Sequence, residues 1–253
     1  MADVKLSQLA AVSPASVAAG AALWTFPGHI DGLKLEWLAA NQLRVTTGSA
    51  YIQSLGYAIN VAAAITKTGM TLTANTWYHV YLYMNGATPD IEFVTTAPAA
   101  AYNGTARSKT GDTTRRYLGS VKCGASANSM MKFSQSGERV QWYDDTGVAP
   151  FRVLSLGVAT TLTAVAAAAV VPVTSRMAQL KLTNSCPDVP ARFTNSDAGQ
   201  TPPANLVSLP AGTNNYAFLD FPLNSSQELQ YFMNGTPVSG GAYIDVLGYV
   251  FER

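Results

Sequence analysis

The stretch that decides the fold is residues 75–121, NTWYHVYLYMNGATPDIEFVTTAPAAAYNGTARSKTGDTTRRYLGSV. Its first part, residues 77–84, is rich in aromatic side chains that are mixed with Val and Leu. Flat and β-branched side chains pack well on a pleated surface, so this part predicts a strand. Asn85 and Gly86 tolerate positive φ and predict a turn, after which residues 91–95 predict the returning strand.

The last part of the stretch is the most charged piece of a chain with few charges. Asp112 is expected to cap a turn or to pair with Arg115 or Arg116. Two adjacent arginines in a strand point to opposite faces, so one is expected at the core edge and the other at a neighbouring subunit. A single glycine does not make a phosphate cradle, which favours this structural interpretation over catalysis. The predicted subunit contacts are Arg107, Asp112, Arg115 and Arg116.

The same stretch resembles a segment found in many tailed-bacteriophage tail-fibre and other tail-associated structural proteins. The resemblance extends upstream into residues 43–45 and 48–52 and covers roughly the middle half of the chain. It implies a virion component, but it does not imply a particular receptor. The residues that carry it in the main stretch are Trp77, Tyr78, His79, Tyr81, Tyr83, Ile91, Glu92, Ala97, Pro98, Tyr102, Arg107, Lys109, Thr110, Gly111, Asp112, Arg115, Arg116, Tyr117, Leu118 and Gly119.

The composition limits the partners of the chain. Charged residues make up only 12% of its 253 residues, against about 25% in an average protein. Sixteen Lys and Arg against fifteen Asp and Glu leave a net charge of +1, which provides no field to gather nucleic acid. We therefore predict no nucleic-acid partner. A weakly charged chain rich in Ala, Thr, Gly and Asn suits an extracellular particle that is stabilised by assembly.

Cysteine use and hydropathy give three further expectations. Cys123 and Cys186 are the only cysteines; their spacing does not decide a disulfide, and two unpaired thiols are the favoured interpretation. The first residues lack the basic region of a secretion signal. Residues 164–173 are too short to cross a bilayer, so no membrane insertion is expected. The predicted location is a virion tail assembled in the host cytoplasm.

Short alternating segments predict an all-β chain in three parts. Residues 1–30 are expected to be an N-terminal attachment arm, in which Lys5, Ser7, Gln8 and Leu9 fit a pattern with which fibre proteins often begin. Residues 31–149 are expected to form an antiparallel β-sandwich or barrel. Residues 150–253 are expected to form a small jelly-roll-like β-sandwich tip. The expected strands in the middle part include residues 33–37, 43–45, 50–52, 58–61 and 70–72, with a break at 67–69.

No constellation in the sequence favours an enzyme. His29 and His79 are the only histidines, and two histidines cannot assemble a three-histidine zinc site. Four carboxylates suggest a glycosidase pair, which needs two groups about 5–10 Å apart, but turn capping and solvation explain them better. The esterase pattern G-x-S-x-G is absent. We predict no catalysis, no cofactor and no metal. The four carboxylates are Asp90, Glu92, Asp144 and Asp145.

Residues 184–205 are rich in Pro, Asn, Asp and Gly and are expected to form a long loop. Long loops without structure are usually functional or disordered. The predicted receptor contacts, to a host glycan or protein, are Asp188, Arg192, Asn195 and Asp197. An ordinary solvated loop is the alternative. Aromatic side chains could also stack on sugars, although a place in the core is favoured for them: Trp37, Tyr51, Trp77, Tyr78, Tyr81, Tyr83, Tyr117, Trp142 and Tyr143.

The predicted function is adhesion by a tail fibre or receptor-binding component of a phage tail. By analogy with such fibres we expect a homotrimer that contacts other tail or baseplate proteins through its arm. Several weak contacts on one particle would multiply through avidity. The alternatives are a baseplate or capsid decoration protein without receptor contact and, less favoured, a polysaccharide-cleaving tailspike.

Overall fold

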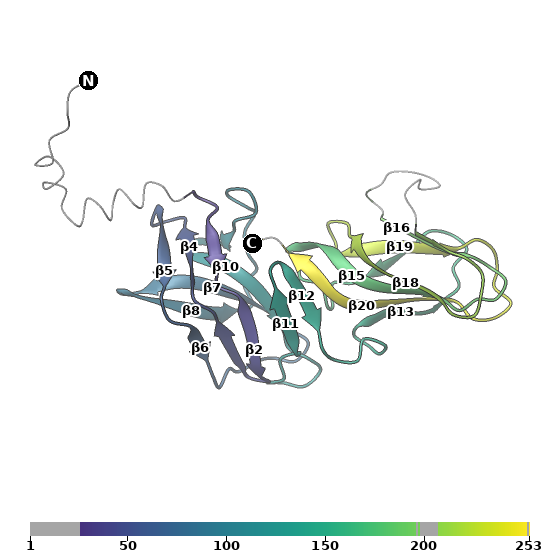
Figure 1. The fold of residues 1–253 in the computed structure, drawn as a ribbon, viewed down its shortest axis with the longest axis horizontal. Helices are drawn as coiled ribbons and strands as arrows, with labels where there is room; N and C mark the ends of the chain where they lie inside the picture. The colour runs from purple at the N-terminus through teal and green to yellow at the C-terminus, as the bar shows by residue number, and fades with distance from the viewer. Residues whose placement is uncertain (1–25, 196, 198–206, 252) are drawn as a thin grey trace, which may run out of the picture.

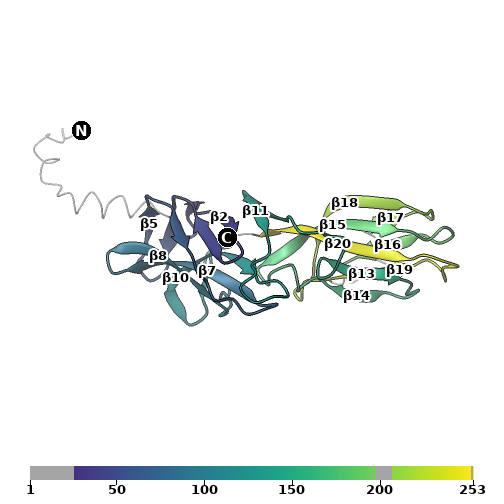
Figure 2. The ribbon, with the colours of Figure 1, turned by 90° about the horizontal axis from the view of Figure 1, so that it is seen from below.

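A computed structural model of the chain describes residues 26–195, 197, 207–251 and 253, and these residues form antiparallel sheets without a helix (Figure 1). The predicted all-β class is therefore confirmed, as a sandwich and not as a closed barrel. A middle part and a C-terminal sandwich lie end to end along the long axis of the molecule (Figures 1 and 2). The predicted arm residues Lys5, Ser7, Gln8 and Leu9 lie outside the described residues.

The middle part is built from three small sheets with the strand orders β1-β4-β5, β2-β3-β6 and β8-β7-β10-β9. The expected hairpin is confirmed: β7 and β8 pair from His79↔Val94 to Asn85↔Thr88 around a turn in which Gly86 has a φ of 61°. The strands of these sheets are β1 (Ile30–Gly32), β2 (Leu35–Ala39), β3 (Gln42–Val45), β4 (Gly48–Ile52), β5 (Tyr57–Val61), β6 (Ile65–Lys67), β7 (Trp77–Asn85), β8 (Thr88–Val94), β9 (Ser108–Lys109) and β10 (Asp112–Lys122).

The pairing of β7 with β10 forms the core of the middle part. Tyr81 and Tyr117 are fully buried, with ring centroids 5.9 Å apart. The register of β10 shifts between Tyr117 and Gly119, so the strand carries a bulge next to these rings. A Cβ atom on Gly119 would lie 2.8 Å from the Leu35 side chain, which explains why the bulge needs glycine. The aromatic alternation of residues 77–84 therefore forms core, as a half-buried strand requires.

The C-terminal part is an eight-stranded jelly roll. One sheet has the order β13-β20-β15-β18 and the facing sheet has the order β14-β19-β16-β17, which is the strand order of two interlocked Greek keys. Alternating burial along β15 and β19 places one side of each strand in the core. The strands are β13 (Arg152–Gly157), β14 (Thr163–Ala166), β15 (Ser175–Asn184), β16 (Ala191–Thr194), β17 (Val207–Leu209), β18 (Asn215–Pro222), β19 (Glu228–Met233) and β20 (Ala242–Phe251).

A hairpin joins the two parts through one strand. β11 (Phe133–Ser136) and β12 (Arg139–Trp142) form the hairpin, and β12 pairs with residues 248–250 of β20. The other half of β20 pairs with β13, from Arg152↔Asp245 to Gly157↔Ala242. The predicted division at 149/150 lies between β12 and β13, and both of these strands pair with β20. The two parts therefore share one sheet across the predicted boundary.

Two expectations about local structure are wrong. The expected loop 184–205 contains β16, because Ala191 and Phe193 are buried while the strand pairs with both β17 and β19. Long-range pairing here overrides the local turn residues. Residues 70–72 form no strand, since the Leu72 N–H donates to the Asn128 side chain at 2.7 Å instead of to a ladder. The strand of this region is β6 instead, and its last residue, Lys67, lies in the segment 67–69 that was expected to be a break.

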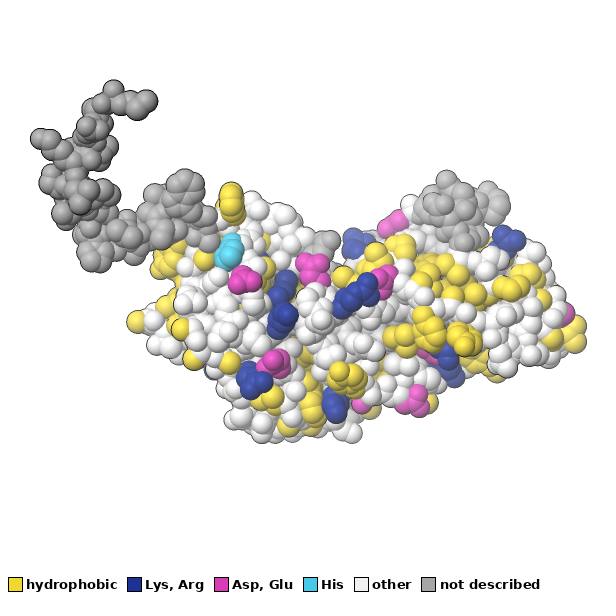
Figure 3. Space-filling view, in the orientation of Figure 1, with side chains coloured by type: hydrophobic (Ala, Val, Ile, Leu, Met, Phe, Trp, Pro, Cys, Tyr) yellow, Lys and Arg dark blue, Asp and Glu magenta, His cyan; other side chains and the backbone are white. Residues whose placement is uncertain are grey.

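Few charges reach the surface, and apolar side chains are spread over the visible face (Figure 3). Cys123 and Cys186 are buried free thiols, as expected. Among the described residues, no helix has the length and hydrophobicity that a membrane span requires. The stability of the fold therefore depends mainly on packing and on a small number of buried polar contacts.

One buried chain of hydrogen bonds runs from the middle part to the entrance of the jelly roll. The His79 Nδ1 lies 2.8 Å from the Ser120 hydroxyl, and that hydroxyl lies 2.8 Å from the Tyr117 hydroxyl. Tyr117 is in turn 2.9 Å from the Thr174 hydroxyl, directly before β15. Tyr249 of β20 donates to the Ser120 carbonyl at 3.2 Å. These groups satisfy one another where water is excluded.

The buried histidine of this hydrogen-bonded series makes the stability of the protein depend on pH. Burial lowers the pKa of His79 from 6.5 to about 4, so the folded protein holds a neutral ring while the unfolded chain binds a proton. The free energy of unfolding is therefore fully retained above about pH 6.5 and falls by up to roughly 3 kcal/mol as the pH drops to about 4. Urea unfolding at pH 7, 5.5 and 4.5 measures the loss.

The matched control is His79→Gln, which keeps a hydrogen-bonding group beside Ser120 but does not titrate in this range. Asp90 and Asp112, whose pKa values lie below their usual 3.8, are present in both proteins, so a loss that comes from their protonation is the same in the wild type and in the variant. An equal loss of stability in the wild type and in the Gln variant would contradict the role of His79.

Candidate functional site

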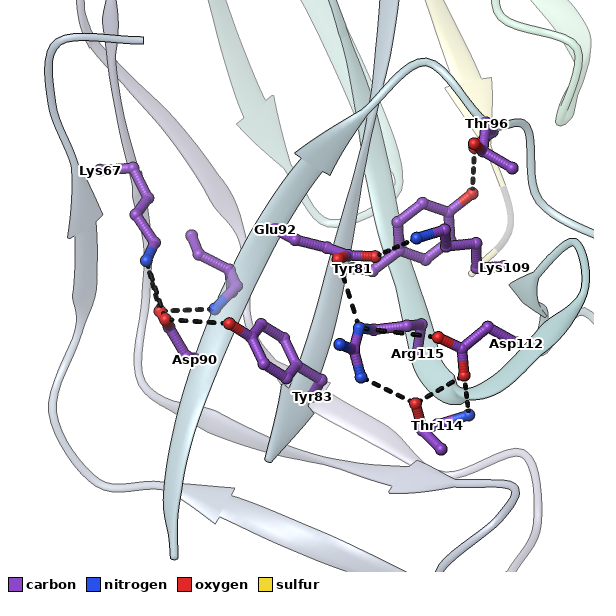
Figure 4. A network of polar contacts seen from close by, with 11 residues as sticks. Lys67, Tyr81, Tyr83, Asp90, Glu92, Thr96, Lys109, Asp112, Thr114 and Arg115 are labelled. Carbon is purple, nitrogen blue, oxygen red and sulfur yellow. Dashed lines mark hydrogen bonds and ion pairs between the residues drawn. The ribbon is translucent and has the colours of Figure 1, made fainter. Parts of the chain in front are cut away.

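Several charged residues of the middle part meet in a network beside β7, β8 and β10 (Figure 4). Glu92 accepts a hydrogen bond from the Lys109 Nζ at 2.9 Å, and its other oxygen lies 3.3 Å from the Arg115 Nε. The Arg115 guanidinium also covers the ring of Tyr83, 3.9 Å from its centroid. Asp112 accepts the Thr114 N–H at 2.9 Å, as expected for a turn cap. Hydrogen bonds from Thr114 hold the pKa of Asp112 below its usual value.

A second contact extends this network to β6. The Lys67 Nζ lies 2.7 Å from Asp90 on β8, and the Tyr83 hydroxyl donates to the same carboxylate at 3.3 Å. Burial acts to raise the pKa of Asp90, but hydrogen bonds from Lys67 and from the Ile91 N–H bring it below its usual value. Both candidate carboxylates on β8, Asp90 and Glu92, therefore form ion pairs with Lys and Arg side chains of the same chain. Their contacts are those of a structural network.

The four predicted subunit contacts fall into different environments. Asp112 and Arg115 belong to the network, and the Arg107 Nη1 donates to the Ala99 carbonyl at 3.0 Å. Arg116 points to the opposite face and is 1% exposed. The expected opposite orientation of the two arginines is confirmed. Contact of any of these residues with another subunit stays a prediction, and the buried side chain of Arg116 does not reach the surface of this chain.

Arg116 is a buried cation with incomplete hydrogen bonding. Its Nη2 donates to the Gly28 carbonyl at 3.3 Å, but its Nε and Nη1 have no hydrogen-bond partner among the described residues. Tyr102 lies nearby, with its ring centroid 5.9 Å from the guanidinium carbon. Burial lowers the pKa of Arg116; the nearby Tyr102 acts to raise it, and the charge of Arg253 acts to lower it further. No carboxylate contacts this side chain within the part of the chain that the structure describes.

The four predicted receptor contacts do not form one cluster. Asp188 precedes β16, Arg192 lies within it, and Asn195 and Asp197 follow it, so the strand separates the two ends of the set. The Asp188 carboxylate accepts the Cys186 S–H at 2.9 Å and the Val238 N–H at 3.2 Å, which lowers its pKa. It therefore ties the loop before β16 to the loop before β20. Receptor contact by these residues stays a prediction.

A different surface of the jelly roll exposes aromatic rings. Tyr216 and Phe218 on β18 are 60% and 61% exposed, and their ring centroids lie 5.6 Å apart in an edge-to-face arrangement. The Lys181 Nζ on the neighbouring strand lies 5.8 Å from the Tyr216 centroid. We call the outward side chains of β15 and β18 the outer face; apolar side chains gather over these strands in Figure 3. Its members are Gln179, Lys181, Thr183, Tyr216, Phe218 and Asp220.

The outer face ends at a cavity of about 380 Å³ next to β12. Both terminal nitrogens of Arg139 donate to the carboxylate of Asp220, and this pairing raises the pKa of Arg139. Among the described strands, β18 pairs only with β15, so it lies at the edge of its sheet. The cavity is lined by Arg139, Thr174, Arg176, Met177, Asp220 and Val250.

The exposed rings of β18 are not among the site residues that were predicted from the sequence. The signal was present, because Tyr216, Phe218 and Asp220 alternate at period two, and a face that carries a carboxylate points to water. Among the described residues, no group of three His, Cys, Asp or Glu side chains is placed to hold a metal ion. The arrangement offers a contact surface built from rings and hydrogen-bonding groups.

The environment of Arg116 predicts an unusual response to mutation. Arg116→Met is expected to leave the free energy of unfolding unchanged or to raise it by up to about 2 kcal/mol, because it removes a buried, under-paired charge. Arg115→Met is the matched control and is expected to lower it by about 1 kcal/mol, since it removes the contacts with Glu92 and Tyr83. Urea unfolding of both variants measures the difference. A larger loss for Arg116→Met than for Arg115→Met would show that Arg116 has a partner needed for stability.

Comparison with known proteins does not add to this geometry. No protein-family model matches the chain, and no curated protein matches it.

Proposed function

We propose that the chain is a non-enzymatic structural protein of a phage tail, a tail-fibre or receptor-binding component that attaches the particle to a bacterial surface. The observation that carries the proposal is the pair of exposed rings on the outer face, Tyr216 and Phe218. Aromatic side chains are enriched at interfaces, where they contribute large contact area at little cost in conformational entropy.

The position of the outer face supports an adhesive role. The jelly roll extends away from the middle part (Figures 1 and 2). The Arg253 guanidinium donates to the carbonyls of Gly32 and Leu33, each at 2.8 Å, so the last residue returns to the middle part. In this proposal the middle part faces the particle while the jelly roll contacts a partner.

The low charge supports multivalent binding. Large apolar side chains exposed on a soluble protein often mark an interaction surface, and a single flat face of this kind binds weakly. Several copies on one particle would convert weak contacts into durable adhesion. We propose a homotrimer joined to other tail or baseplate proteins through residues 1–30, on the basis of the resemblance and the low charge alone. Host glycan and host protein are both compatible with the outer face.

The function is tested by competition. Excess purified full-length protein is expected to slow adsorption of virions that contain the chain. The double variant Tyr216→Ser/Phe218→Ser is expected to need at least tenfold more protein for the same effect, about 1.4 kcal/mol, because it removes the exposed rings. Its urea midpoint should be unchanged, since both rings are more than half exposed. Tyr57→Ser, at an exposed ring of the middle part, is the matched control and should compete like the wild type.

Two outcomes would contradict the proposal. Equal competition by the double variant and the wild type would exclude the outer face as the adhesive surface. If the wild-type protein fails to compete and antibodies against the chain label the baseplate or capsid, the chain is a decoration protein without receptor contact.

A further inference from the structure

A groove beside β2 combines two cavities. They have volumes of about 430 Å³ and 380 Å³, and Trp37 and Lys132 line both of them. Each volume lies in the range of small-ligand pockets, about 300–1,000 Å³. We call the two cavities together the Trp37 groove. Its walls come from β2, from residues 124–135 and from residues 143–151, so it lies where the middle part meets the jelly roll.

Two aromatic rings flank one ammonium group in this groove. The Lys132 Nζ lies 5.4 Å from the Trp37 ring centroid and 5.7 Å from the Tyr143 ring centroid. Tyr143 is 58% exposed, although it follows directly after the buried Trp142. The Trp37 Nε1 donates to the Met130 carbonyl at 3.1 Å, which fixes the orientation of the indole ring. The groove therefore offers fixed and accessible ring faces.

The walls of the groove are held in place before any ligand binds. The Leu35 N–H donates to the Gln135 side chain at 2.8 Å and joins β2 to β11, which lie side by side in Figure 1. The Met130 N–H donates to the Ala40 carbonyl at 2.7 Å. A site that is already ordered loses less entropy on binding.

The charges of the groove are mixed and nearly balanced. Asp144 and Asp145 line one cavity, the Glu36–Arg44 ion pair lines the other, and Lys132 lies between them. Asp145 accepts the Gly147 N–H at 2.8 Å. Neither the Asp144 carboxylate nor the Lys132 ammonium has a hydrogen bond or ion pair within the described residues. The groove therefore keeps a free acceptor and a free donor beside its rings.

We propose that the Trp37 groove binds a neutral oligosaccharide of two or three sugar units. A pyranose ring has apolar C–H faces that pack against aromatic rings, and its hydroxyls donate to carboxylates and accept from ammonium groups. Balanced charge disfavours both an anionic and a cationic ligand. Two adjoining cavities suit neighbouring units of one chain. The site is separate from Tyr216 and Phe218, so the inference goes beyond the proposed function.

Direct binding tests the proposal with the full-length protein. The probes are four neutral trisaccharides built from glucose, mannose, galactose or N-acetylglucosamine, with trigalacturonate as the anionic comparison. At least one neutral probe is expected to change the tryptophan fluorescence, and Trp37→Phe should abolish that signal. Tyr143→Ala and Lys132→Met are each expected to weaken binding at least tenfold, measured by calorimetry. Tyr57→Ala removes an exposed ring outside both the groove and the outer face and should leave the affinity unchanged.

Three results would overturn the proposal. These are no binding by any neutral probe up to its solubility limit, tighter binding of trigalacturonate than of every neutral probe, and a change of native mass instead of affinity in the Tyr143→Ala variant. The last result would make the groove an interface between protein chains. The adsorption competition does not require this groove, so the two proposals can fail separately.

Discussion

Strand β20 is the constraint on which the other parts of the molecule depend, because it is paired along both of its sides. On one side it lies against β15 over its whole length, from Ser175↔Phe251 to Asn184↔Ala242. On the other side it is shared between β12 and β13. A strand that pairs on both sides has few unsatisfied backbone groups, so it can be buried throughout. Its burial pattern agrees, since Tyr249 and Phe251 are each 1% exposed.

The aromatic side chains close the joint around this strand. Trp142 contacts Trp77 of the middle part, Tyr249 of β20 and Phe151 at the start of the jelly roll, with ring centroids 5.8–6.3 Å apart. Each ring buries a large area, and tilted or edge-on pairs add to that burial. The residues that look like sugar-stacking candidates in the sequence are therefore divided. Trp77, Tyr81, Tyr117 and Trp142 build the joint and the core, whereas Tyr143 is exposed and Trp37 is only partly buried.

The sequence predicted those strands whose local pattern agrees with their place in the fold. Period-two alternation and the Asn85-Gly86 turn identified β7 and β8, because local chemistry and tertiary structure agree there. β16 was missed, because its turn-like neighbours mask a strand that is held by β17 and β19. The opposite orientation of Arg115 and Arg116 follows from strand geometry alone. Their partners did not follow, since Glu92 and Gly28 are far away in sequence and are brought close only by the fold.

The candidate sites could be predicted from the sequence even less well than the strands. Asp188 and Asn195 share a polar segment of sequence, but four residues of β16 place them at opposite ends of a strand. The Trp37 groove collects residues from three separate segments, so no sequence window contains it. Exposed aromatic rings are identified only when the inward and outward positions of each strand are known. Fold class thus depends on local pattern, whereas binding surfaces depend on which distant segments meet.

The double pairing of β20 also has a mechanical consequence. A pull that separates the middle part from the far end of the jelly roll would act along the axes of β15 and β20, because these two strands follow the long axis of the molecule (Figures 1 and 2). Ladder hydrogen bonds lie perpendicular to the strands, so such a load shears many of them at once instead of opening them one after another. The joint is thereby suited to carry tension between the two parts of the molecule.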